Sequence, residues 1–340
     1  MKTSSFLSQH KHIITCPKCN GDLEKIFVGE DIQCSRCSCI FTWEDGIPRL
    51  YVPHQPESPT NVTETVRSFY EQTPFPNYED GDSIDTLRQR AERGIYATLL
   101  ERQIPDDAMV LEAGCGTGQF SNYLASRGTR AIFATDITLN SLKLGHEFKE
   151  RNQLENLAFL QMNLFRPMFR EESFDVVISN GVLHHTDNPY LGFKSISKLV
   201  KTNGYIIIGL YNKFGRMATN VRRFLFRMFG AANLKFLDYR IRSGSLGDTR
   251  RDTWYADQYQ HPRESSHSIG EVLEWFDNCG FAFVNSVPMS KPSQKFSRDT
   301  QLFDPSPMGN SIQRGLVQAK LIYSGIQNSG FFIMIGKRVS

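Results

Sequence analysis

The sequence has no long apolar run and little excess charge of either sign. No stretch of about 18 consecutive apolar residues occurs in the 340 residues, so we expect no membrane-spanning helix. The N-terminal segment, residues 1–16, lacks the apolar core of a signal peptide. We therefore expect a cytoplasmic protein, in which cysteines bind metals more often than they form disulfides. The net charge of +3 is too small to indicate the class of partner.

The cysteines are unevenly distributed. Five of the seven lie in the first forty residues, where two C-x2-C pairs are separated by fourteen residues. Each pair directs two sulfurs to one point, and two facing pairs give the tetrahedral thiolate shell that Zn²⁺ favours. With short strands expected at residues 23–28 and 39–43, the pattern predicts a zinc ribbon. The predicted ligands are Cys16, Cys19, Cys34 and Cys37, with Cys39 as an alternative to Cys37.

Two other interpretations of the cysteines stay open. The segment could be a ribbon that has lost its metal, or a dithiol redox centre. Two paired C-x2-C units suit a metal better than a single exchange site. A segment this short buries too little apolar surface to fold alone, so a metal would stabilise it.

A glycine-rich turn at residues 114–118 carries the clearest signal. It follows an apolar strand at 109–113 and precedes a helix expected at 119–127. Such a turn lets the backbone approach a ligand closely. A dinucleotide fingerprint needs glycine at position 119, where this chain has Gln119. The run E-x-G-x-G-x-G from Glu112 resembles motif I of the class I S-adenosylmethionine (SAM) methyltransferases.

That resemblance implies a fold and a first set of site residues. In the family this loop holds the methionine part of SAM, which implies contacts from Glu112, Gly114, Cys115, Gly116 and Gly118. The alternative is a glycine-rich turn without a ligand. The resemblance covers residues 95–210 closely, then 268–286 and 330–338 by pattern.

Alternating strands and helices predict an α/β fold, a Rossmann-like doubly wound sheet of seven strands. A helix at 86–103 leads into the sheet, and a capping box, Ser268 with Glu271, begins a helix at 271–278. The last strand resembles the antiparallel strand seven of the family. The expected strands are 109–113, 131–135, 158–162, 174–179, 204–210, 280–285 and 331–336.

Polar residues at the ends of strands two and three predict the nucleoside part of the SAM site. Asp136 lies twenty residues after Gly116, where a carboxylate can accept bonds from both ribose hydroxyls. The alternative for Asp136 is a turn or helix cap. Ile137 and Leu164 would contact the adenine. At the next strand end the family commonly carries Asp, whereas this chain has Asn163, whose amide oxygen can also accept a bond from the adenine amino group.

The fourth strand ends in Asn180-Gly-Val-Leu-His-His185. The resemblance implies that Asn180 faces SAM and that His184 and His185 face the substrate. Either histidine could remove a proton from an attacking group. They could instead be structural, because methyl transfer can proceed on proximity and orientation alone.

Aromatic residues and a histidine elsewhere are candidates for substrate contact. The segment 66–78 is rich in aromatics and interrupted by prolines, and in the family it often covers the SAM site as a lid. Its Tyr70 and Tyr78 could line the pocket or simply pack the linker onto the domain. Tyr211 follows the fifth strand, and His261 lies where the chain returns to the core.

An insertion follows the fifth strand. Residues 213–264 hold eleven Lys or Arg against five Asp or Glu. Met217, Val221, Phe224, Leu225 and Met228 recur at helical spacing, with arginines on the other side. We expect a cap helix with its apolar face on the domain and its arginines in solvent. A basic amphipathic helix can also meet nucleic acid, a membrane or an anionic substrate.

We thus predict five parts: a zinc ribbon (1–50), a linker and lid (51–85), a SAM-binding core (86–212), a cap (213–265) and the rest of the core (266–340). The predicted function is a SAM-dependent methyltransferase with Zn²⁺ that acts on a small metabolite. One alternative is RNA methylation using the ribbon and the basic cap, although residues 1–50 carry six basic and six acidic side chains. The other is a SAM-binding scaffold whose ribbon docks a protein.

Overall fold

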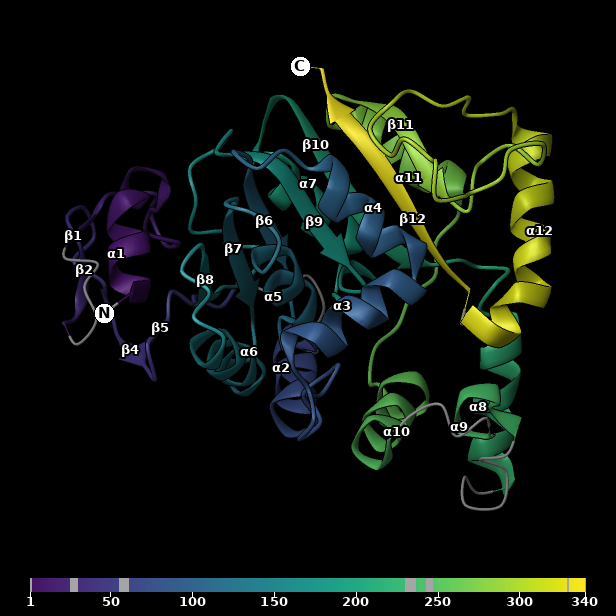
Figure 1. The fold of residues 1–340 in the computed structure, drawn as a ribbon, viewed down its shortest axis with the longest axis horizontal. Coiled ribbons are helices and arrows are strands. Elements are labelled where there is room, and N and C mark those ends of the chain that lie inside the picture. The colour runs from purple at the N-terminus through teal and green to yellow at the C-terminus, as the bar shows by residue number, and fades with distance from the viewer. Residues whose placement is uncertain are drawn as a thin grey trace.

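The computed structural model describes residues 2–24, 30–54, 61–229, 237–242, 247–328 and 330–339. At one end of the molecule lies a small N-terminal unit of residues 2–50 (Figure 1). Its first helix is α1 (Lys2–Gln9), and its short strands are β1 (Leu23–Glu24), β2 (Ile32–Cys34), β3 (Ile40–Phe41), β4 (Trp43–Glu44) and β5 (Ile47–Pro48). The predicted strand at 23–28 is present at Leu23–Glu24, and its remainder lies outside the described residues.

A seven-stranded mixed sheet forms the centre, as the sequence predicts. Its order is β11-β12-β10-β9-β6-β7-β8, and only β12 runs antiparallel to its neighbours. The strands are β6 (Met109–Ala113), β7 (Ala131–Asp136), β8 (Leu157–Gln161), β9 (Phe174–Asn180), β10 (Val200–Tyr211), β11 (Phe281–Val287) and β12 (Phe331–Arg338).

Both faces of this sheet are buried, which explains why its strands are apolar without a strict alternation. Leu111 and Phe133 face one apolar layer, whereas their neighbours Val110 and Ile132 face the other. The first layer is completed by α1, α7 (Pro189–Ser197) and α11 (Ile269–Asn278). The second contains α3 (Ile84–Arg93), α4 (Ile95–Gln103), α5 (Gln119–Ala125) and α6 (Leu139–Arg151).

The N-terminal unit is built into the edge of the sheet beside β8. The backbone N–H of Thr15 donates to the oxygen of Met168 over 2.7 Å, and the N–H of Arg170 donates to Ile13 over 2.8 Å. The rings of Phe6 and Phe133 lie 5.1 Å apart. The unit and the sheet therefore share one continuous apolar core.

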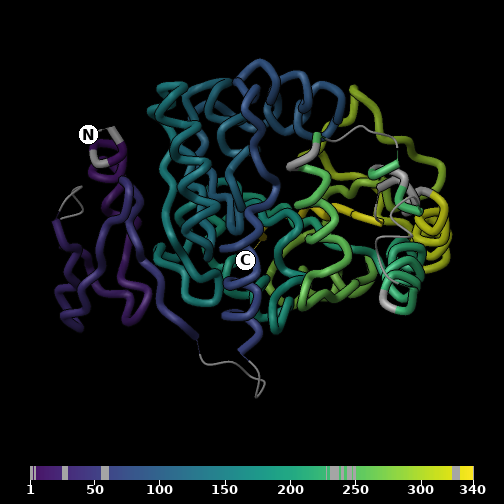
Figure 2. Tube along the Cα trace, turned by 90° about the horizontal axis from the view of Figure 1, so that it is seen from below, coloured from purple at the N-terminus to yellow at the C-terminus, as the bar shows by residue number. Residues whose placement is uncertain are grey.

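The opposite end of the molecule holds the cap and the C-terminal helix (Figure 2). The cap contains α8 (Met217–Phe229), α9 (Tyr239–Arg242), α10 (Asp248–Tyr255) and a π-helical turn, η5 (Ala256–Gln260). The C-terminal helix α12 (Ser311–Asn328) packs against α8. No helix in the described ranges is long and apolar enough to cross a membrane.

Two local predictions differ from the structure. The helix expected over 86–103 is divided at Gly94 into α3 and α4, because glycine weakens a helix interior. Ser268 caps α11 as expected, but the Glu271 carboxylate turns to His267, 2.7 Å away, rather than back to the cap. The lid agrees with the sequence: it begins with α2 (Val62–Gln72), and this helix ends before Pro74, so the segment 66–78 is not one regular helix.

The prediction for the cap helix α8 is wrong about which of its faces is buried. Arg222 on α8 is buried and Arg223 is half-buried, whereas Val221, Phe224 and Met228 are exposed. The cause is a buried carboxylate, Glu264, which pairs with Arg223 at 2.9 Å. The side chain of Arg227 lies outside the described residues.

Candidate functional site

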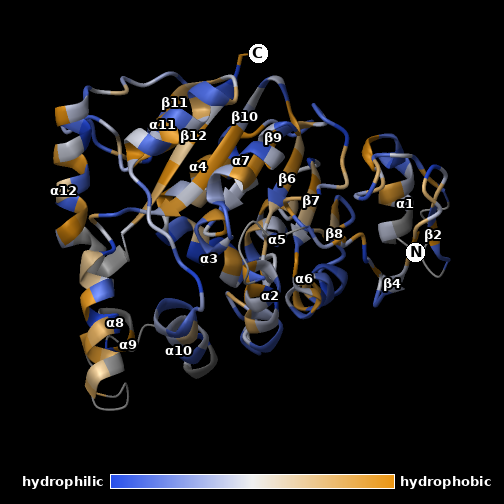
Figure 3. Cartoon of the chain, turned by 180° about the vertical axis from the view of Figure 1, so that it is seen from behind, coloured by the Kyte–Doolittle hydropathy of each residue, from blue (hydrophilic) through white to orange (hydrophobic). Residues whose placement is uncertain are grey.

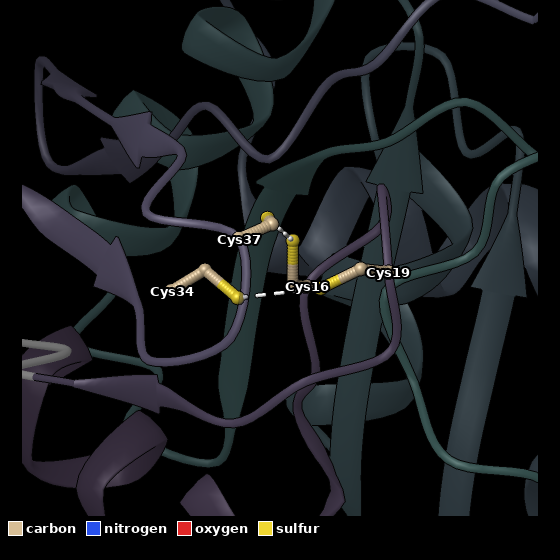
Figure 4. A group of neighbouring side chains, drawn as sticks. All are labelled: Cys16, Cys19, Cys34 and Cys37. Atoms are coloured by element: carbon tan, nitrogen blue, oxygen red, sulfur yellow. Dashed lines mark hydrogen bonds between the residues drawn. The ribbon is translucent and has the colours of Figure 1, made fainter.

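The four predicted metal ligands converge in the N-terminal unit (Figure 4). Their sulfurs all lie within 4.8 Å of one another, with Cys16 and Cys37 at 3.7 Å and Cys19 and Cys34 at 3.4 Å. Tetrahedral Zn²⁺ with bonds of about 2.3 Å needs sulfur separations of about 3.8 Å. The cluster therefore fits one Zn²⁺, and Cys39 stands outside it.

The glycine loop lies between β6 and α5 and requires glycine for two reasons. Gly116 has φ +55°, and a Cβ atom there would lie 2.2 Å from the backbone oxygen of Phe75. Gly118 has φ +68° and caps α5, and a Cβ there would lie 2.3 Å from the Phe159 ring. The loop is thus closely covered by the lid on one side and by the core on the other.

Two carboxylates stand beside the loop. Asp136 accepts the backbone N–H of Gly116 over 2.8 Å and that of Thr138 over 2.9 Å. Glu112 accepts the Ser121 hydroxyl. Burial raises the pKa of both, that of Glu112 to about 7. Asp136 is therefore held at the end of β7 by backbone donors, and it is one of the residues that line the cavity.

The wall at the end of β8 is shared with the segment that follows the N-terminal unit. The Asn163 amide donates to the backbone oxygen of Val52 over 3.0 Å, while its oxygen accepts the N–H of Phe165 over 3.1 Å. The His54 ring stacks on Phe165 at 4.2 Å. Asn163 is thus fixed in place, with one lone pair of its amide oxygen left for a ligand.

A cavity of about 460 Å³ extends from this loop toward the cap. This volume is in the ordinary range for small-molecule sites. The lid covers it: the Gln119 amide donates to Asn77 over 2.9 Å, and the Thr117 hydroxyl donates to Pro76. The predicted residues on its wall are Glu112, Gly114, Cys115, Gly116, Asp136, Ile137, Asn163, Leu164, Asn180, Tyr70, His185 and Tyr211.

A cluster of polar side chains from the cap and the lid lines the end of the cavity beside the cap. The Tyr70 hydroxyl donates to Asp257 over 2.7 Å, and the Gln258 amide donates to Asp257 and to the Tyr211 hydroxyl. Beneath Tyr211, the guanidinium of Arg216 lies 3.7 Å from the centre of the ring and forms a two-bond ion pair with Glu264. Burial raises the pKa of Asp257.

The two adjacent histidines have different surroundings. His185 lines the cavity, and its Nδ1 lies 2.8 Å from the backbone oxygen of Arg263. A carbonyl only accepts, so Nδ1 carries the proton and Nε2 keeps a lone pair in the neutral ring. Burial lowers the pKa of His185 to about 4, so the ring is neutral at pH 7. This geometry makes His185 the better candidate for a base.

Comparisons with known proteins agree with this architecture. Residues 111–208 match a family described as a methyltransferase domain. This segment forms a class I SAM-dependent methyltransferase domain. An uncharacterised protein of Synechococcus sp. is 26% identical over 66% of this chain and 60% of its own length. A mitochondrial ubiquinone biosynthesis O-methyltransferase of Dictyostelium discoideum is 28% identical over 31% of this chain and 35% of its own length.

The fold has counterparts among solved structures. PKMT2 from Rickettsia typhi shares it with a TM-score of 0.50 at 14% identity, over 71% of this chain and 52% of that one. The chain spans about three-fifths of the length of the first curated relatives it matches, 60% and 61%.

Four predicted site residues do not line the cavity of the methyltransferase domain. His184 is fully buried against Tyr211, and neither of its ring nitrogens has a hydrogen-bond partner. His261 lies behind His185, with ring centres 3.8 Å apart. Tyr78 stacks on Phe148 at 4.8 Å and binds Asn122, and Gly118 acts in the turn itself. The rings of His184, His261 and Tyr78 pack against neighbouring aromatic rings, which no local sequence pattern reveals.

The structure adds residues that the sequence did not single out. Asp257, Gln258 and Trp254 come from the cap and line the cavity of the methyltransferase domain. For Asp257 and Gln258 the signal in the sequence is a polar run, Asp257 to Gln260, next to the predicted substrate residue His261. In the structure this run is the π-helical turn η5, a rare element that often marks functional sites.

Proposed function

We propose that this protein transfers the methyl group of SAM to a small acceptor with an apolar body and a hydroxyl or amine group. The cofactor would occupy the end of the cavity beside Gly114, Gly116, Asp136 and Asn163. When bound, SAM supplies an activated methyl group on a positively charged sulfur. The acceptor would occupy the end lined by Tyr70, His185, Tyr211 and Asp257.

The anchored ring of His185 is the observation that carries this proposal. As the acceptor attacks the methyl group, Nε2 takes the proton of the acceptor, while Nδ1–H stays bonded to the Arg263 oxygen. The carbon–sulfur bond breaks, and its electron pair remains on sulfur. Tyr70 and Gln258 hold Asp257 so that it can orient the polar group of the acceptor.

The charges around the acceptor end favour a neutral small molecule over RNA. Arg216 and Arg223 are both paired with Glu264, so neither is free for a phosphate. The cysteine cluster belongs to the unit beside β8, at the opposite end of the sheet from the cap (Figure 1). The relative named a ubiquinone biosynthesis O-methyltransferase also supports a small acceptor.

The test uses methyl-labelled SAM and a cell extract separated into small molecules and RNA. We expect label in the small-molecule fraction, lost with His185→Gln and retained with the matched variant His12→Gln in the exposed turn after α1. Isothermal calorimetry should show SAM binding unchanged in His185→Gln. Label found in RNA would overturn the choice of acceptor, and unchanged rates in His185→Gln would remove the base.

A further inference from the structure

The exposed apolar side chains are concentrated on one part of the surface. Thirteen large hydrophobic residues are exposed in the described chain, and eleven of them fall within residues 214–237 and 308–323. On α8, Met217, Val221, Phe224 and Met228 have the spacing i, i+4, i+7, i+11 that defines one helix face, and Phe229 at the end of the helix is exposed as well. Val221, Phe224 and Met228 are each about 60% exposed, at 60%, 62% and 62%.

Helix α12 continues this surface. Ile312 is 75% exposed, Leu316 54% and Tyr323 80%, again on one face of the helix. The two helices pack against each other at the edge of the molecule remote from the cysteine cluster, where orange bands mark them in Figure 3. We call the exposed residues of these two helices the α8–α12 face.

Helix α8 is anchored to the rest of the fold by the side opposite to the α8–α12 face. Phe226, on the opposite side of α8, packs on Tyr255 and Tyr259 of the cap. Arg223 donates to the backbone oxygen of Gln258 over 2.6 Å from that same inner side. Because α8 is anchored by its polar and aromatic side, its apolar side is free for an external partner.

The charge pattern of the two helices indicates the partner. Neither α8 nor α12 contains an Asp or Glu, and together they contain five Lys or Arg. Arg222 and Arg223 face inward, but Lys320 on α12 and Arg242 on α9 are exposed. Apolar side chains flanked by basic ones, with an exposed tyrosine, are typical of helices that lie in the headgroup region of an anionic bilayer.

We propose that the α8–α12 face binds the surface of an anionic lipid bilayer. A second copy of the chain fits less well, since a two-fold contact would bring this face, with its exposed Lys320 and no Asp or Glu from either helix, against itself. RNA fits less well too, because nucleic-acid interfaces are polar and strongly basic, whereas this surface is dominated by Phe, Met, Ile and Val side chains.

Flotation of the full chain with vesicles tests the proposal. We expect binding to phosphatidylcholine vesicles that contain phosphatidylglycerol, and much weaker binding to phosphatidylcholine alone. The double variant V221S and F224S should reduce binding roughly tenfold or more, since each side chain contributes apolar area. The control I40S removes an equally exposed apolar residue, 60% exposed, from the N-terminal unit and should bind like the wild type.

Three outcomes would overturn the proposal. The first is no binding of the wild type to either vesicle. The second is equal binding of the double variant and I40S, with both folded by circular dichroism. The third is a dimer in light scattering that the double variant converts to a monomer, which would make the face a contact between two copies. Substitution of Lys320 with Gln should lower the preference for anionic lipid without affecting the fold, because this side chain is exposed.

Discussion

The side chain of Gln161 donates a hydrogen bond to the backbone oxygen of Ile137 over 3.0 Å. Its oxygen lies 3.4 Å from Nε of Arg49, at the end of the N-terminal unit. One amide therefore connects the cysteine-containing unit to a residue on the wall of the cofactor end of the cavity.

Replacing Gln161 with Leu should weaken SAM binding through this connection. Loss of one such bond costs about 1 kcal/mol, or roughly a fivefold change in affinity. Calorimetry with SAM measures it, and Gln33→Leu on an exposed position of β2 is the matched control. Unchanged affinity in Gln161→Leu would show that the two parts act independently.

Replacing Asp136 should weaken SAM binding more than replacing Gln161 does. Asp136→Asn removes a charged acceptor from the expected ribose position, so we expect SAM affinity to fall by about 1.5 to 3 kcal/mol. Asp85→Asn, at a side chain that is 79% exposed, should leave affinity unchanged. If both variants bind SAM equally, Asp136 serves only to hold Gly116 and Thr138.

The cysteine cluster should hold one Zn²⁺ per chain. Metal analysis of protein made without a histidine tag should find about one equivalent, and Cys34→Ser should lose it because the thiolate is a ligand. Cys39→Ser should retain it, since Cys39 stands outside the cluster. A folded N-terminal unit without metal would contradict the zinc site.

Breaking the buried ion pair of the cap should lower the free energy of unfolding. Glu264→Gln leaves Arg216 and Arg223 without their carboxylate, and we expect the free energy of unfolding at pH 7 to fall by about 3 kcal/mol. Glu274→Gln, at an exposed position of α11, is the control. Urea unfolding of both variants and the wild type measures the difference.

The same ion pair should make the free energy of unfolding fall at acidic pH. The arginines hold the pKa of Glu264 at about 2 against the burial that would raise it, below the ordinary value of 4.5. The stabilisation is therefore complete above pH 4.5 and is lost as the pH falls from 4.5 toward about 2. The advantage of the wild type over Glu264→Gln should shrink in that window, and a constant difference would refute the assignment.

The central sheet was predictable because its signals are local. Gly116 and Gly118 follow an apolar strand, and Asp136 ends the next one, so the positions of the strands along the chain and the cofactor end of the sheet could be inferred from the sequence. The face of α8 was not predictable. Helical periodicity places Phe224 and Arg223 on different sides, but the buried partner Glu264 lies forty-one residues further along the chain.

The roles of the residues at the acceptor end were not predictable from the sequence either. Nothing in the local sequence shows which of His184 and His185 is the better candidate for a base. The hydrogen bond that distinguishes His185 comes from the backbone oxygen of Arg263, seventy-eight residues further along the chain. Asp257 is one acid among several in the insertion until Tyr70 contacts it from the lid. Side chains whose roles depend on contacts between distant segments are those that sequence reasoning missed.

The position of the N-terminal unit beside β8 has a consequence for the order of folding. Residues 2–50 are synthesised before the strand that they cover, Leu157–Gln161, which follows more than a hundred residues later. Closing so long a loop is entropically costly and slow relative to local contacts. We infer that docking of the unit is a late folding step. Until it occurs, the apolar side chains of Phe6, Leu7 and Ile14 stay exposed to solvent, because the sheet residues that bury them have not yet formed their strands.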